Sequence, residues 1–253
     1  MNSILSKLIY NPEQQQYASQ GKVNIARTVE PLDYKSAAER ILEQIDHAKG
    51  ALYSSSYEYP GRYSRWDIGF VNPPVQLRSV ENRFYVEALD KRGELLIPIL
   101  LNAIAELESI EAKLVSGRIE GIIHRTERTF TEEERTSQPS IFHVLRSLKN
   151  LFYAPEDSFL GLYGAFGYDL VFQLESIQLR QKRDSELSDM VLFIPDELIV
   201  VDHQMSSAYR ISYEFEKDGQ STPRLREQDQ SFLRLPRPGG KRITYIRPDI
   251  MRD

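Results

Sequence analysis

The stretch SSSYEYPGRYSRW, residues 54–66, gathers residue types that could recognise a small zwitterion. Serine hydroxyls and a carboxylate accept hydrogen bonds from an ammonium group, and arginines bind a carboxylate. An amino-acid site needs both kinds of group and a wall for the side chain. The residues that could supply these groups are Ser54, Ser55, Ser56, Glu58, Arg62, Ser64 and Arg65. The same stretch also fits the solvated end of an ordinary β-hairpin, and both interpretations stay open.

Other kinds of site find little support in the sequence. The chain has no cysteine, which excludes disulfides, thiolate catalysis and cysteine-bound zinc. The G-x-S-x-G elbow of serine hydrolases is absent. The four histidines are scattered without a metal-binding spacing, and His203 stands at an expected hairpin turn. In GLYGAFG, residues 161–167, the glycines lack a phosphate-binding spacing, and close packing explains them better than ligand contact.

Composition places the chain among globular proteins. It has 253 residues, of which 41% are hydrophobic and 27% charged, with a net charge of −5. Acidic and basic residues are spread along the chain, so no basic face for nucleic acid stands out. The first residues lack the pattern of a secretory signal, and no window has the length and apolarity of a membrane span. We therefore expect a cytoplasmic protein that binds neither nucleic acid nor membrane.

Periodic apolar residues predict three main helices. One covers 34–45, with Asp33 as its N-cap, and another follows the cap Ser140. The third is predicted over 94–116, after a turn at 91–93. The charged residues 118–138 that follow it indicate a solvated connector.

Alternating residues predict antiparallel strands between these helices. The strands are expected at 22–30, 51–58, 66–71 and 82–90, with a hairpin formed by 189–203 and 208–216. Pro73 and Pro74 are expected to interrupt further strand pairing. The predicted fold is α+β, with a polar lead-in over 1–21, one domain over 22–216 and a poorly ordered tail over 217–253.

Three stretches, taken in order, resemble the N-terminal part of anthranilate synthase component I. They are SSSYEYPGRYSRWDIGFVNPP, GAFGYDLVFQLE and DMVLFIPDELIVVDH. The likeness is greatest to the long form, in which the chorismate-using component shares one chain with its glutamine amidotransferase, and it covers about residues 22–216. It implies packed antiparallel sheets with helices outside. It also implies a part in making anthranilate and pyruvate from chorismate and glutamine-derived ammonia, with Mg²⁺, the first committed step of tryptophan synthesis.

The resemblance also implies an effector site. In that family the N-terminal region helps to bind the feedback inhibitor tryptophan, through a Leu-Leu-Glu-Ser-like strand followed by an Arg-Tyr-Ser segment. Here a serine replaces the glutamate, and it stays open which serine takes the key position. The residues predicted for tryptophan are Ser54, Ser55, Ser56, Arg62 and Ser64.

The family's catalytic groups and Mg²⁺ ligands lie in its C-terminal half, so the resemblance predicts none of them here. Whether this chain is an enzyme by itself is left open. The expected partners are the chorismate-binding half, the glutamine amidotransferase part and tryptophan as effector. Two alternatives remain: a free-standing amino-acid-binding or interaction module, and part of a sister enzyme such as aminodeoxychorismate synthase. A chain of this kind should expose an apolar surface, bordered by residues 161–167.

Overall fold

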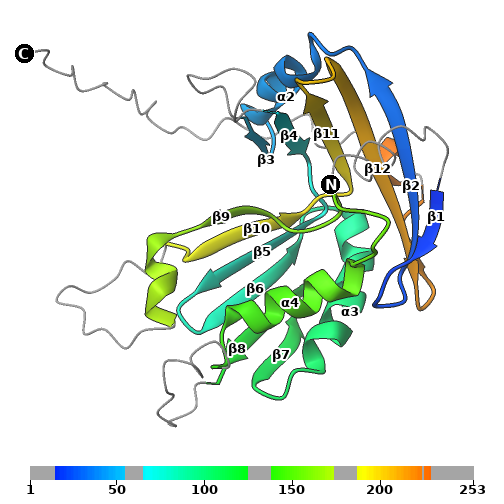
Figure 1. Ribbon diagram of the computed structural model, residues 1–253. Helices are drawn as coiled ribbons and strands as arrows, with labels where there is room; N and C mark the ends of the chain where they lie inside the picture. The colour runs from blue at the N-terminus through cyan, green and yellow to red at the C-terminus, as the bar shows by residue number, and fades with distance from the viewer. Residues whose placement is uncertain (1–14, 55–64, 125–137, 174–186, 224, 229–253) are drawn as a thin grey trace, which may run out of the picture.

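The computed structural model consists of two antiparallel β-sheets that meet at one corner, with helices packed on them (Figure 1). It describes residues 15–54, 65–124, 138–173, 187–223 and 225–228. Both sheets are antiparallel throughout and the helices are few, which confirms the predicted α+β class.

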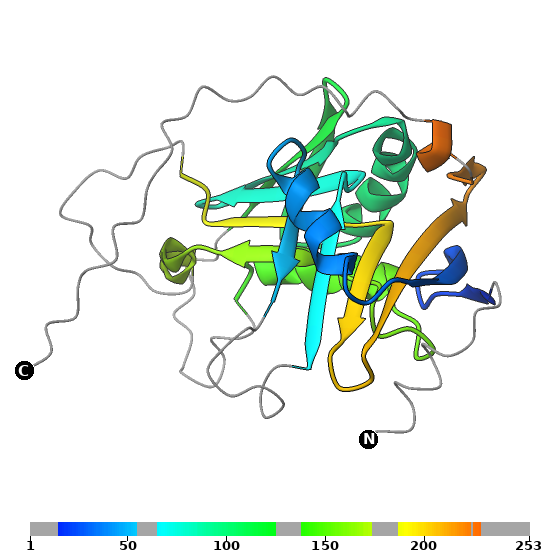
Figure 2. The same cartoon turned by 90° about the horizontal axis from the view of Figure 1, so that it is seen from above.

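The larger sheet has seven strands in the order β1-β2-β12-β11-β4-β3, and β13 pairs with the end of β12. Its strands are β1 (Gln15–Ala18), β2 (Asn24–Leu32), β3 (Gly50–Tyr53), β4 (Trp66–Val71), β11 (Glu197–Asp202), β12 (Ser207–Lys217) and β13 (Gln220–Ser221). Helix α2 (Ala37–Ile45) packs against β3, β4 and β11 (Figures 1 and 2). Its Ala37 and Ile41 are buried there, so one apolar stripe holds the helix to the sheet.

The smaller sheet has six strands in the order β7-β8-β6-β5-β10-β9. Its strands are β5 (Val75–Val80), β6 (Arg83–Ala88), β7 (Ile110–Val115), β8 (Arg118–Ile123), β9 (Tyr163–Phe166) and β10 (Met190–Ile194). Helices α3 (Lys91–Ala105) and α4 (Ile141–Phe152) lie on one face of this sheet (Figure 1). Two short helices complete the described fold, the 3₁₀ helix η2 (Tyr168–Gln173) and α5 (Leu225–Gln228).

One hydrophobic core runs through both sheets. Leu77 and Phe84 of the smaller sheet and Leu100 of α3 are fully buried in it. The rings of Phe152 in α4 and Phe215 in β12 lie 5.3 Å apart and join the two halves of the core. The two sheets are therefore packed as one unit.

Helix α4 confirms the predicted start at Ser140. A capping box joins Ser140 and His143, because each side chain bonds the other residue's backbone N–H. Helix α2 begins differently from the prediction: Ser36 is its N-cap residue, and Asp33 lies in the turn before it. The Asp33 carboxylate accepts hydrogen bonds from the Ser36 backbone N–H and hydroxyl. Side-chain bonding within a turn of this kind competes with helix capping for the same aspartate.

The helix predicted over 94–116 is only half correct. Helix α3 already begins at Lys91, with the Asp90 side chain accepting from the Gly93 N–H, so residues 91–93 are not a turn. It ends at Ala105, and the chain then forms the β7–β8 hairpin in place of more helix and a connector. Ser116 and Gly117 have φ angles of +50° and +83°, which suit a two-residue hairpin turn. Pairing of β7 with β8 favours the strand over the helix that the spacing allows.

The chain crosses between the two sheets at two places that the sequence did not predict. One is Pro73–Pro74, where an end of strand pairing was predicted, and the other lies within 189–203, where one continuous strand was predicted. β4 ends at Val71 in the larger sheet, and β5 begins at Val75 in the smaller one, so pairing resumes directly after Pro73 and Pro74. The predicted strand 189–203 divides in the same way into β10 and β11, which belong to different sheets. The prolines therefore mark a change of sheet, because they cannot donate to either ladder.

The described structure also extends beyond the predicted limits of 22 and 216. β1 lies in the predicted lead-in and pairs with β2, while β13 and α5 lie in the predicted tail. Thr222 is buried, and its backbone N–H donates to Phe215 O. None of the helices in the described ranges has both the length and the apolar character needed to cross a membrane.

Candidate functional site

The predicted effector residues fall where β3 ends and β4 begins. Ser54 follows β3 directly and is exposed. The other four, Ser55, Ser56, Arg62 and Ser64, lie outside the described residues. The structure therefore describes the two flanks of the predicted site, namely Tyr53–Ser54 and Arg65–Asp67.

Arg65 is already committed to a protein partner. Its guanidinium donates to the Asp202 carboxylate, with Nη2 2.9 Å from Oδ2, and lies 4.5 Å from the centre of the Trp66 ring. Asp202 is nearly buried and also accepts from the backbone N–H groups of Gln204 and Met205. Arg65 thus anchors β4 to the β11–β12 turn, and this role takes its charge away from ligand binding.

His203 has a second set of contacts at the same turn. Its Nε2 lies 2.9 Å from Asp67 Oδ2, and its Nδ1 lies 3.0 Å from the Tyr34 hydroxyl. Its backbone N–H donates to Arg65 O at 2.8 Å. Asp67 is buried, and its second oxygen, Oδ1, accepts no hydrogen bond from the described residues. The row Tyr34–His203–Asp67 therefore connects the approach to α2, the β11–β12 turn and the start of β4.

Aromatic side chains from both sheets gather beside these flanks. The ring of Tyr53 lies 6.2 Å from that of Tyr163 in β9, and the ring of Trp66 lies 6.5 Å from that of Phe159. Phe70 of β4 packs against Tyr163 as well, at 6.0 Å. Burial raises the pKa of both Tyr53 and Tyr163, so both rings carry neutral hydroxyls. We call these side chains the aromatic wall; they are Tyr53, Trp66, Phe70, Phe159 and Tyr163.

A buried ionic network holds the corner where the chain changes sheets. Arg92 pairs with Asp90 and Asp196, and Arg226 of α5 pairs with Asp196 at 2.6 Å. Burial favours the neutral form of Arg92, but the carboxylates of Asp196 and Asp90 outweigh it and raise the pKa of Arg92. Burial also raises the pKa of the Asp196 carboxyl, against the opposing effect of Arg226 and Arg92. We take Asp196 as ionised because two guanidinium groups contact it.

Arg226 also reaches the other crossing. Its guanidinium donates to the backbone oxygen of Val71 at 2.9 Å, at the end of β4. The short helix α5 therefore fixes both crossings between the sheets at once. This network is a structural clamp, and its charges are paired with one another.

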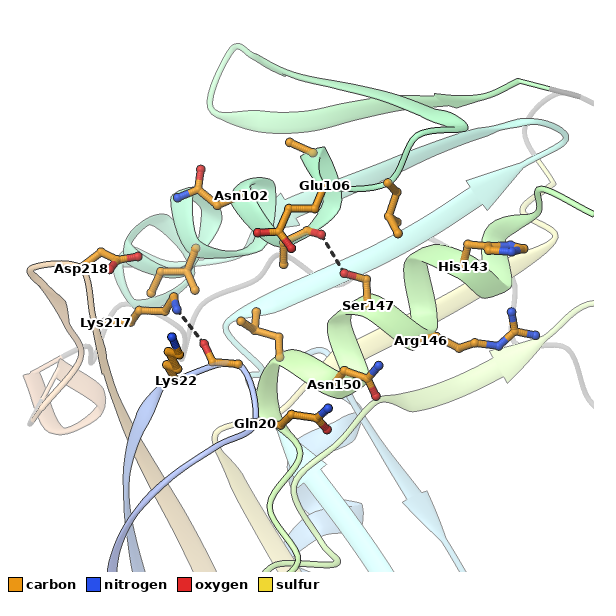
Figure 3. Close-up of a pocket in the computed structure, with 16 residues that line it drawn as sticks. Gln20, Lys22, Asn102, Glu106, His143, Arg146, Ser147, Asn150, Lys217 and Asp218 are labelled. Atoms are coloured by element: carbon orange, nitrogen blue, oxygen red, sulfur yellow. Dashed lines mark hydrogen bonds between the residues drawn. The ribbon is translucent and has the colours of Figure 1, made fainter. Parts of the chain in front are cut away.

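A groove of about 1020 Å³ lies between α3, α4 and the turn from β1 to β2 (Figure 3). Its rim carries charges of both signs, from Lys22, Arg146, Lys217, Glu106 and Asp218. Two of its polar groups are bonded within the protein, because Ser147 Oγ donates to Ala103 O and Lys217 Nζ to Gly21 O (Figure 3). The groove contains none of the predicted effector residues, and its mixed charges select no single ligand.

The described residues provide no evident metal centre. Among them, no three His, Cys, Asp or Glu side chains come together in a way that could hold a metal ion.

Comparison with known proteins finds relatives among the anthranilate synthases. No family model matches the chain. Over 199 residues it is 36% identical to the anthranilate synthase of Azospirillum brasilense, which covers 79% of this chain and 27% of that protein. Over 209 residues it is 26% identical to anthranilate synthase component 1 of Serratia marcescens, covering 80% of this chain and 40% of that protein. The component 1 of Vibrio cholerae is 22% identical over 202 residues, which cover 77% of this chain and 38% of that protein.

The two-sheet α+β fold and these similarities agree with one class of protein. The chain is similar to anthranilate synthases over about four fifths of its length, which confirms the predicted resemblance. Of these three relatives, the Azospirillum protein has the highest identity to the chain. It is also a longer protein, because a match of similar length covers a smaller share of it. The chain spans between about a quarter and two fifths of the length of these relatives.

Proposed function

We propose that this chain is the N-terminal regulatory and scaffolding part of an anthranilate synthase, which acts in tryptophan biosynthesis. The observation that supports it best is the 36% identity to an anthranilate synthase over 79% of the chain. The proposed reaction converts chorismate and ammonia, supplied from glutamine, into anthranilate and pyruvate. In this proposal the remainder of the enzyme supplies Mg²⁺ binding and catalysis, and the chain is inactive alone.

The role proposed for this chain in regulation is to bind tryptophan. Serine hydroxyls and Arg62 would hold the amino and carboxyl groups of the ligand, between the end of β3 and the start of β4. The aromatic wall supports an aromatic ligand, because Tyr53 is 39% exposed beside Tyr163. Aromatic rings in offset or edge contact stabilise one another beyond the area that they bury. Arg65 is left out of this site because Asp202 holds it.

An anthranilate fluorescence assay tests the catalytic half of the proposal. The chain alone, given chorismate, ammonia and Mg²⁺, is expected to show no turnover. The part of the Azospirillum brasilense protein that this chain does not match is then added. We expect turnover only in the mixture. Turnover by the chain alone refutes its inactivity, and a silent mixture counts against the enzyme assignment.

Tryptophan inhibition of the active mixture tests the regulatory half. Ser55→Ala and Ser56→Ala should each raise the tryptophan concentration needed for half inhibition by about tenfold, if each removes a charge-assisted hydrogen bond. Ser221→Ala, on an exposed residue of β13, serves as the matched control and should leave inhibition unchanged. Unchanged inhibition in all three variants would place the effector site elsewhere.

A second candidate is a free-standing amino-acid-binding module. The observation that favours it is that the aromatic wall is formed entirely within this chain. It predicts saturable tryptophan binding by the chain alone, with a rise in thermal stability as the ligand concentration increases. Calorimetry without heat and a melting temperature unchanged in millimolar tryptophan would exclude it.

A further inference from the structure

β9 is the last strand of the smaller sheet, and among the described residues its outer edge is free. It pairs with β10 on one side, and no described residue pairs with the other side. Figure 1 shows it at the margin of the sheet, beyond β10. A free edge exposes backbone N–H and C=O groups that can pair with another strand, so soluble proteins usually protect edges with charges, prolines or bulges.

The two edges of this sheet differ in such protection. β7, at the opposite edge, carries the exposed charges Glu111 and Lys113. β9 has the sequence Tyr-Gly-Ala-Phe, with neither charge nor proline, and it pairs with β10 in regular register. Within the described part of the chain, the β9 edge is therefore the one that lacks protection against a further strand.

Exposed aromatic side chains lie at the end of β9. Phe166 is 55% exposed and Tyr168 is 89% exposed, and the intervening Gly167 is also exposed. The ring of Phe166 stacks on that of Phe142 in α4, 6.2 Å away. Large exposed apolar groups beside the unpaired edge of a strand are typical of a surface that another polypeptide covers.

The inner side of β9 holds it rigidly in place. A Cβ added at Gly164 would lie 2.1 Å from Val191 O, so the backbones of β9 and β10 approach too closely for any side chain there. The Gly167 N–H donates to Asp189 O at 2.7 Å. The edge is thus already in the conformation that an added strand requires, which reduces the entropy lost on binding.

We propose that the free edge of β9 receives a β-strand from the part of the anthranilate synthase polypeptide that this chain does not match. This inference rests on the proposed function. Two observations favour this occupant. The relatives contain 60% or more of their residues outside the match, so a long polypeptide is there to supply a strand. The described part of the smaller sheet ends at β9, a strand without protecting charges. The added strand would pair with the backbone of β9 and carry apolar side chains that cover Phe166 and Tyr168.

Binding of the complementary Azospirillum part to the chain, measured by calorimetry, tests the proposal. Ala165 is exposed on β9, so Ala165→Lys and Ala165→Glu place a charge on the edge without filling the core. Leu114→Lys places the same charge on the protected edge, at an exposed residue of β7. We expect both Ala165 variants to weaken binding by about tenfold or more and the control to change it by less than about twofold. Circular dichroism and melting temperatures verify that every variant is folded.

Three other results would overturn the proposal, and each can be told apart from the others. Binding by all variants equal to wild type, with anthranilate still produced, refutes docking on β9 and leaves the proposed function intact. Neither binding nor anthranilate from the wild-type mixture refutes both. A wild-type dimer that Ala165→Lys converts to a monomer, with binding to the Azospirillum part unaffected, identifies a second copy of the chain as the occupant.

Discussion

The imidazole of His203 lies 2.9 Å from the carboxylate of Asp67, and this contact joins the β11–β12 turn to the start of β4. The Asp67 side chain is only 7% exposed, whereas that of His203 is 36% exposed. A surface histidine therefore provides the partner of a buried carboxylate. The segment that carries the predicted effector residues is followed in the chain by Arg65, where the described structure resumes just ahead of this contact.

Removal of this histidine should destabilise the chain. His203→Ala leaves Asp67 Oδ2 buried without its partner, and the loss is expected to be roughly 1–3 kcal/mol in the free energy of unfolding. Urea denaturation at neutral pH measures it. His47→Ala, at an exposed residue after α2, is the matched control and should have little effect. Equal stability of the two variants would show that Asp67 does not depend on His203.

The two glycines at 161 and 164 should respond differently to alanine. At Gly164 the added methyl group meets Val191 O, and overpacking of this kind costs about 1–3 kcal/mol or more. At Gly161 nothing lies within 4 Å of the added Cβ, so Gly161→Ala should leave stability nearly unchanged. Thermal melting of both variants decides it, and similar losses would contradict close packing as the reason for Gly164.

The buried network at the sheet corner predicts a large effect for Arg92. Arg92→Met keeps most of the volume but leaves Asp90 without its buried partner, which typically costs about 3–5 kcal/mol. Arg118→Met removes ion pairs to Glu87 and Glu120 that lie on the sheet surface, and it should change stability much less. Chemical unfolding of both variants would reject the clamp if their losses were equal.

High pH should weaken the fold through buried tyrosines. Burial first, and then the charge of Asp157, raise the pKa of Tyr17 and Tyr213. Because the unfolded chain ionises its tyrosines near pH 10 and the folded chain holds these protons, stability is complete below about pH 10 and falls as pH rises beyond it. Urea unfolding between pH 8 and 11 measures the decline, where both limits are roughly set by the tyrosine pKa.

Tyr17→Phe gives this prediction its control. The variant loses the hydrogen bond from the Tyr17 hydroxyl to Asp157 Oδ2, 2.9 Å long, and should be about 1–2 kcal/mol less stable at neutral pH. It should also lose stability less steeply above pH 10, as set by the tyrosine pKa. The same slope in the variant and wild type would assign the decline to other groups.

Local patterns in the sequence determined several features. Alternation located β2, β4 and β12, and the helical repeat after Ser140 located α4, because the burial of one face repeats with a period that the sequence displays. Three motifs in order predicted the resemblance to anthranilate synthase, and the comparison with known proteins confirms that similarity. These signals are read within a few residues and require no knowledge of distant partners.

Tertiary structure alone decided the rest. The spacing of apolar residues in 107–115 fits a helix as well as a strand, and only pairing in the smaller sheet decides for β7. The segment 189–203 reads as one strand until Asp196 meets Arg92, a partner 104 residues away that holds the crossing between sheets. His203 looked like a simple turn residue because Asp67 and Tyr34 are distant in sequence. Pairing between distant residues leaves no periodic trace in a single chain, so only the folded structure reveals it.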